Sequence, residues 1–189
     1  MTRFVALTSR LAAALVLALN LAGGAALAAP TDDPKVVAQN VYNDIKSNLG
    51  ADRSNALVDQ YFDTRIMALQ ALGLPYRSLS DTQKSGYVQA FDTYFKRTLF
   101  HVLTTYKDAT ISNLVSRISG NNAEVHCTVK SADGQSIDLS LTLVASQQSW
   151  KAIEVTVDNV GLITSYKPQF KSLFEQQGYD GLIGYLNSH

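Results

Sequence analysis

The sequence contains one cysteine, few charged side chains and no excess of charge of either sign. One cysteine can neither close an internal disulfide nor supply the several thiolates of a multi-cysteine metal site. Charged residues make up 17% of the 189 positions, where about 25% is usual, and the formal net charge is zero. Nucleic-acid-binding domains carry a basic excess, so the composition argues against a nucleic-acid partner.

The sequence also lacks the motifs of common covalent chemistry. It has no Gly-x-Ser-x-Gly elbow, no phosphate-binding loop and no His-Glu-x-x-His helix. His126 and Cys127 are neighbours on a predicted strand, so their side chains point to opposite faces and cannot act as a nucleophile and its base. His101 is expected on the polar side of a helix. We therefore expect no catalytic residue, no metal and no cofactor.

The one long apolar run, Leu11 to Leu19, lies near the amino terminus. Two arginines precede the run, and Ala26-Leu27-Ala28 after it has the small residues of a signal-peptidase site. Residues 1–28 are predicted to be a cleaved secretory signal, because the run is shorter than the about 20 apolar residues of a membrane span. Residues 29–189 would then form a single exported domain with 14 basic and 16 acidic side chains.

The first half of that domain has helical periodicity. Asp33 and Pro34 are typical of a helix start, and Gly50 ends the predicted helix. A second helical region is predicted from about 52 to 72, where Gly73-Leu74-Pro75 breaks it. The third and clearest helix begins at a capping box, Ser80 to Gln83, and its apolar residues recur to about position 106.

After Lys107 the apolar period changes to two, which is typical of strands. Four strands are predicted, at about 109–118, 125–129, 137–143 and 153–157, with Asp133-Gly134 as a hairpin turn. The chain returns to helix from about Val160, with breaks at Pro168 and Gly178. The predicted fold class is α+β: a four-stranded antiparallel sheet, with helices packed on its one apolar face.

Several segments resemble the MlaC (toluene-tolerance) family in their order and spacing. The carboxyl-terminal part carries three of them, WKAIEV, LITSYKPQF and GYDGLI, where Glu154 and Lys167 stand for the family's usual aspartate and arginine. Upstream, LVDQYFD, Ala71-Leu72-Gly73 and the stretch from Gln83 to Leu99 also resemble it. The resemblance covers nearly all of the predicted exported domain.

The resemblance implies a periplasmic phospholipid-binding component of the Mla ABC transport system, with an apolar lipid pocket between the sheet and the helices. Such a carrier would exchange phospholipid with an outer-membrane lipoprotein complex and an inner-membrane ABC transporter complex, and so maintain outer-membrane lipid asymmetry. Three alternatives stay open. They are a hopanoid-associated paralogue, a small isomerase-like enzyme on a cone-shaped α+β scaffold, and a partner-binding module with a solid core.

The inward strand positions and the apolar faces of the neighbouring helices are the candidate lipid-binding residues. Arg97 and Lys167 are candidates for approaching a lipid phosphate. The predicted lining residues are Phe91, Tyr94, Val125, Cys127, Val129, Leu139, Leu141, Leu143, Val155, Val157, Leu162, Ile163 and Tyr166.

Overall fold

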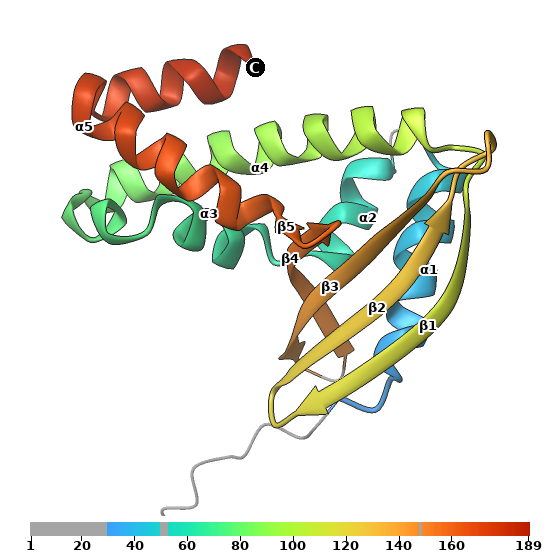
Figure 1. Cartoon of the computed structure of the whole chain (residues 1–189). Coiled ribbons are helices and arrows are strands. Elements are labelled where there is room, and N and C mark those ends of the chain that lie inside the picture. Colours follow the sequence, from blue (N-terminus) through green and yellow to red (C-terminus); the bar gives the residue numbers. More distant parts are fainter. Residues whose placement is uncertain (1–29, 50–52, 148) are drawn as a thin grey trace, which may run out of the picture.

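The structure, a computed structural model, describes residues 30–49, 53–147 and 149–189 (Figure 1). The predicted signal peptide lies outside the described residues. The helices are α1 (Pro34–Ser47), α2 (Ser54–Tyr61), α3 (Thr64–Leu72), the short 3-10 helix η1 (Leu74–Ser78), α4 (Asp81–Thr105) and α5 (Leu162–Ser188). The strands are β1 (Thr110–Ser119), β2 (Asn122–Lys130), β3 (Ser136–Ser146), β4 (Ser149–Val157) and β5 (Val160–Gly161).

The helix starts follow the capping signals in the sequence. The Asp33 side chain accepts a hydrogen bond from the Lys35 amide (2.9 Å) at the start of α1. At α4, the Ser80 hydroxyl accepts from the Gln83 amide while the Gln83 side chain accepts from the Ser80 amide, as predicted. Each contact satisfies an amide that the first helical turn leaves without a partner.

The prediction of one helical region from 52 to 72 is wrong, because two helices meet at Phe62 and Asp63. Phe62 has extended backbone and forms an isolated parallel bridge with Ala152 of β4. The Asp63 amide donates to the Ala152 carbonyl (3.0 Å), and its carboxylate caps α3 by accepting from the Ile66 amide (2.9 Å). The Asp63 amide thus bonds to the sheet in place of a helical carbonyl, and the helix breaks there.

The strands form one antiparallel meander, β1-β2-β3-β4-β5. The fifth strand corrects the predicted count of four. Asp158 and Asn159 have φ values of 47° and 66°, which suit a tight two-residue turn and bring Val160 back to pair with Val157. The predicted start of the last helix near Val160 therefore falls two residues early.

Two register shifts change which side chains face inward. On β4, Glu154 pairs with Thr142 and Ala152 with Leu143, so Ile153 is the extra residue of a bulge. Ala152 before the bulge and Val155 after it both point inward, whereas simple alternation placed Ile153 inward. The second shift, in β1, lies between Ser112 and Val115, where Asn113 has a φ of 56°.

The helices form a layer that extends past the sheet. Figure 1 shows α1 lying along one face of the curved sheet, while α3, α5 and the first half of α4 cluster near β4. The second half of α4 runs out from that cluster and passes over the sheet before it turns into β1. In the described part of the chain, no helix is both long and apolar enough to cross a membrane.

Candidate functional site

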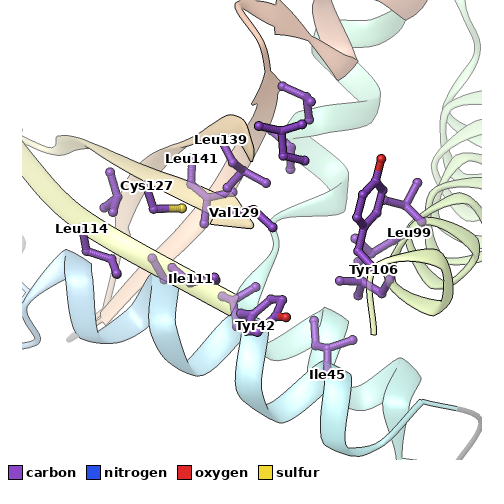
Figure 2. A pocket seen from close by; sticks show the side chains of 18 of the residues that line it. Tyr42, Ile45, Leu99, Tyr106, Ile111, Leu114, Cys127, Val129, Leu139 and Leu141 are labelled. Atoms are coloured by element: carbon purple, nitrogen blue, oxygen red, sulfur yellow. The ribbon is translucent and has the colours of Figure 1, made fainter. Parts of the chain in front are cut away.

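An apolar cavity of about 330 Å³ lies between the sheet, α1 and the second half of α4. Figure 2 shows Leu99 of α4 and Tyr106, the residue that follows α4, facing Val129 and Leu139 of the sheet across it, with Tyr42 of α1 on a third side. The lining residues are Ala38, Val41, Tyr42, Ile45, Phe62, Leu99, Val102, Leu103, Tyr106, Ile111, Leu114, Val125, Cys127, Val129, Ile137, Leu139, Leu141, Val155 and Val157.

Strand alternation supplies one wall of the cavity. The inward positions of β2 pair with inward positions of β3, as Val125 does with Leu141 and Cys127 with Leu139, so the apolar side chains stand in rows. Seven of the predicted lining residues lie in this wall. They are Val125, Cys127, Val129, Leu139, Leu141, Val155 and Val157.

The other six predicted residues lie outside the lining of this cavity. Leu143 sits beyond the β-bulge, buried against Ala152. Phe91 and Tyr94 lie near the middle of α4, among aromatic rings of α5. Leu162, Ile163 and Tyr166 belong to the first turns of α5, and pack against the main core.

The aromatic rings near the first half of α4 fill their space. Phe91 stacks on Phe95 with ring centroids 6.3 Å apart, and meets Phe170 edge-on at 6.4 Å. Tyr166 stacks on Phe170 at 5.1 Å and meets Tyr94 edge-on at 5.4 Å. These separations are those of packed aromatic pairs, so these rings are packed against one another in the core.

Sequence reasoning missed the contributions of α1 and of the second half of α4. Val41 and Ile45 of α1, and Leu99 and Leu103 of α4, recur at four-residue spacing, so their apolar faces could be read from the sequence. The sequence carries no signal that these two faces stand apart. The cavity appears only when the curved sheet is placed between them.

The cavity reaches the surface beside two of its own lining residues. Val102 of α4 is 44% exposed and Val157 of β4 is 37% exposed, although both line the cavity. Val160, paired with Val157 across the final hairpin, is 62% exposed. Val102 and Val157 therefore mark an apolar mouth, and Val160 extends the apolar surface beside it.

A polar contact joins two walls of the cavity at Tyr42. The Tyr42 hydroxyl donates to the Ala109 carbonyl, in the connection between α4 and β1. The Lys46 ammonium donates to the same carbonyl (3.1 Å) and to the Tyr42 hydroxyl (3.2 Å). Two hydrogen bonds thus tie α1 to the connection that follows α4, and the third lies within α1.

The described lining residues include no Asp, Glu, Lys, Arg or His. The Cys127 thiol belongs to the strand wall, and burial raises its pKa, so the neutral thiol is favoured there. The described residues also hold no group of three or more His, Cys, Asp or Glu that could bind a metal. This lining offers dispersion contact and water exclusion, and it places no acid or base beside a ligand.

The two predicted phosphate contacts lie in the helical cluster. The Arg97 guanidinium donates to the Leu186 carbonyl of α5 (2.8 Å). The Lys167 side chain passes close to Gly73, at the end of α3. Neither residue belongs to the lining of the cavity.

Two comparisons bear on this site. The family model described as MlaC protein matches residues 37–188. Among solved structures, the phospholipid-binding protein from Ralstonia solanacearum, in complex with a phospholipid, is similar with a TM-score of 0.69. The sequences are 20% identical, and the match covers 82% of this chain and 96% of that chain. At this identity the likeness supports a shared fold.

Proposed function

Because this protein belongs to the MlaC family, we propose that it is a periplasmic phospholipid-binding carrier. It would shuttle phospholipid between an outer-membrane lipoprotein complex and an inner-membrane ABC transporter complex, and so maintain outer-membrane lipid asymmetry. Residues 1–28 would direct its export. The observation that carries the proposal is the cavity of about 330 Å³, apolar on every wall and open at Val102 and Val157.

The energetics explain why such a carrier is needed. Each methylene exposed to water costs about 0.8 kcal/mol, so two acyl chains of about 16 carbons cost roughly 25 kcal/mol. Free phospholipid therefore does not cross an aqueous compartment at a useful rate. A protein that shelters acyl chains about as well as a bilayer removes this barrier, and still allows the lipid to leave.

The character of the lining favours the carrier over the enzyme alternative. An isomerase on this scaffold needs an ionisable group inside the pocket, and the described lining residues include no Asp, Glu, Lys, Arg or His. A partner-binding module with a solid core is disfavoured by the cavity itself. The hopanoid-associated alternative uses the same kind of pocket, so the identity of the bound lipid decides between it and phospholipid.

The proposal is tested by purifying the protein from the periplasm and identifying bound lipid by native mass spectrometry and extraction. We expect phospholipid on the wild type. The substitution Val129→Trp places a ring in the cavity wall, and should reduce bound lipid at least tenfold. Val115→Trp is the matched control, because Val115 is 63% exposed on the edge strand β1 and lies outside the cavity lining.

Thermal melting of both variants separates loss of binding from loss of folding. Wild-type protein that comes out empty from cells with intact membranes would overturn the proposal. So would a folded Val129→Trp variant that carries as much lipid as the Val115→Trp control. Recovery of hopanoids in place of phospholipids would favour the paralogue.

A further inference from the structure

The turn between α3 and α4 carries the most exposed large apolar side chain among the described residues. Leu74, in η1, is 75% exposed, and the cationic side chains of Arg77 and Lys167 lie beside it. We propose that Leu74, Arg77 and Lys167 form a basic tip that docks the protein on an anionic phospholipid bilayer. Leu74 enters the apolar layer, and the two cations meet lipid phosphates. The basic tip is separate from the cavity, because none of its three residues belongs to the cavity lining.

The local backbone holds Leu74 away from the core. Gly73 ends α3 with a φ of 68°, a conformation that favours glycine, and so turns the chain out of the helix. Pro75 restricts the next backbone angle, and Tyr76 packs against Tyr87 of α4 with ring centroids 6.2 Å apart. The turn is therefore anchored through Tyr76, while Leu74 projects into solvent.

The two cations stand on the same side of the turn as Leu74. Side chains three residues apart eclipse each other in a 3-10 helix, so Arg77 shares a face with Leu74. Lys167 comes from α5, and its Cε would lie 3.1 Å from a Cβ placed on Gly73, the residue before Leu74. Both cations are exposed, and neither forms an ion pair with a residue that the structure describes. Their charge is therefore available to a partner.

The charge of the helical layer favours an anionic partner. Residues 64–105 and 162–189 carry seven basic and four acidic side chains, whereas the strands and turns of residues 110–161 carry three basic and five acidic. No acidic residue occurs from 64 to 80 or from 162 to 174, the segments that supply the basic tip. An anionic surface is therefore attracted to the helical end of the protein more than to the sheet.

The combination of an exposed leucine with two cations favours a bilayer over an acidic protein surface. A protein partner would need a pocket shaped to Leu74 and an acid opposite each cation. A bilayer supplies an apolar layer and phosphates without a shaped site. Each cation is worth about fivefold in affinity at an anionic surface, and burial of Leu74 roughly tenfold. The docking is therefore weak and reversible.

Docking at the basic tip leaves the cavity mouth free. Tyr76 contacts Tyr87 on α4, and Val102 at the mouth lies about 22 Å farther along that helix, since each residue adds about 1.5 Å. Figure 1 shows the chain between α3 and α4 at the end of the helical layer that points away from the sheet. The mouth therefore stays accessible to a partner protein while the tip rests on the bilayer.

The test measures binding of the purified wild-type protein to lipid vesicles by cosedimentation. The probe is vesicles of an equal mixture of phosphatidylcholine and phosphatidylglycerol, and pure phosphatidylcholine vesicles are the neutral comparison. We expect half-saturation near about 1 mM accessible lipid on the anionic vesicles, and at least roughly tenfold weaker binding to the neutral ones. Raising the salt from about 0.05 to about 0.5 M should reduce the binding several-fold.

Three single substitutions test the residues of the basic tip. Arg77→Gln and Lys167→Gln should each weaken binding to anionic vesicles about fivefold, and Leu74→Ser roughly tenfold. The three side chains are exposed, so the variants should melt close to the wild-type temperature. The matched control is the double variant Val115→Ser with Arg117→Gln, which removes an exposed valine and an exposed cation from the edge strand β1 and should bind like wild type.

A fluorescent side chain tests whether residue 74 enters the bilayer. Trp150 is the sole native tryptophan and is 3% exposed, so its emission should not respond to vesicles. In Leu74→Trp, anionic vesicles should shift the emission to shorter wavelength, and brominated acyl chains should quench it. Val115→Trp, at a position that is 63% exposed in the wild type, should show neither change.

Absence of binding to anionic vesicles at low salt would overturn the proposal. Equal binding to neutral vesicles would do the same, as would unchanged binding of the three tip variants. If the charge variants bind less but the tryptophan of Leu74→Trp stays in water, the bilayer is not the partner, and an acidic protein surface is favoured in its place. The carrier proposal stands apart from these outcomes, because it depends on the lipid recovered with the protein.

Discussion

The two halves of α4 are packed in different ways, although both carry apolar side chains at helical spacing. The amino-terminal part, as far as Phe95, buries Phe91 and Phe95 in a cluster of stacked and edge-on rings. The second half presents Leu99 and Leu103 to the concave side of the sheet across a cavity of about 330 Å³. One helix therefore belongs to a filled region at one end and to a hollow region at the other.

The difference lies in what faces each half. Across from Phe91, another helix supplies rings such as Phe170, which meet it at 6.4 Å. Across from Leu99, the curved sheet supplies short aliphatic side chains, and Val129 is among them. A helix cannot follow the curvature of a sheet along its whole length, and valines are too short to fill the gap. Filled and hollow regions thus arise from one apolar pattern.

The largest loss of stability is expected when a ring in the filled region is truncated. Phe91→Ala removes a fully buried ring that contacts rings on both α4 and α5. Leaving a cavity there should lower the free energy of unfolding by about 3–5 kcal/mol. Chemical denaturation measures this loss. A loss below about 1 kcal/mol would mean that the rings repack easily, and that the contrast between the two regions is false.

A smaller loss of stability is expected from a change at Glu154, where β4 meets the start of α5. Glu154 of β4 caps α5, because its carboxylate accepts from the amides of Ile163 (2.8 Å) and Thr164 (3.0 Å) and from the Thr164 hydroxyl (3.0 Å). Glu154→Ala leaves these first-turn donors without that partner, and should cost about 2 kcal/mol of unfolding free energy.

Lipid affinity separates this structural role from a binding role. Glu154 lies outside the cavity lining, so the alanine variant should bind a 12-carbon chain within about twofold of wild type when measured well below its melting temperature. Glu154→Gln keeps a side-chain acceptor, and should recover part of the stability. A tenfold loss of affinity in a folded Glu154→Ala variant would show that the contact of Glu154 with α5 shapes the cavity.

In the hollow region, truncating a large apolar side chain to alanine should cost less unfolding free energy than Phe91→Ala does in the filled region. Leu139 faces the cavity and is only partly buried, so Leu139→Ala loses fewer packing contacts than truncation of a core leucine. We expect a loss of about 1 kcal/mol, below the 2–5 kcal/mol typical of buried leucines. Denaturation of this variant beside Phe91→Ala compares the two regions directly. An equal loss in both would mean that the cavity is closed by packing around Leu139.

Sequence patterns predicted the elements better than the cavity. The cap at Asp33, the capping box at Ser80 and the alternation along β2 are local signals, and the structure has each of them. The break at Phe62 and the bulge at Ile153 are not local, because each depends on how β4 pairs with another segment. No single-sequence pattern carries that information.

The candidate site was also predicted only in part from local patterns. Strand alternation placed Val125 and Leu141 on one face, and both line the cavity. Periodicity also grouped Phe91 and Tyr166 with them, since all are apolar and inward-facing, but the structure puts these rings in the filled region. Whether an apolar face meets a partner or stands apart from it depends on sheet curvature and helix placement. These are properties of the assembled fold.

The smallest effect is expected at Tyr61, which joins α2 to α1 through a hydrogen bond from its hydroxyl to the Asp44 carboxylate. Burial, then the hydrogen bond and charge of Asp44, raise the pKa of Tyr61 from 10 to about 12. A raised pKa means that the fold favours the protonated phenol. This contribution is complete below pH 10, and is lost as the pH rises from 10 to about 12.

Tyr61→Phe removes both the hydrogen bond and the titration. At neutral pH the variant should be less stable by about 1 kcal/mol, the net value of one hydrogen bond. Between pH 10 and 12 the wild type should lose this advantage, so the two melting temperatures should converge. Asp44→Asn should weaken the same pH dependence, because the neutral amide removes the charge beside the phenol. A gap between wild type and Tyr61→Phe that stays constant up to pH 12 would mean that Tyr61 titrates alike in the folded and unfolded chains. The contact that holds α2 against α1, beside the hollow region, would then contribute packing without an electrostatic component.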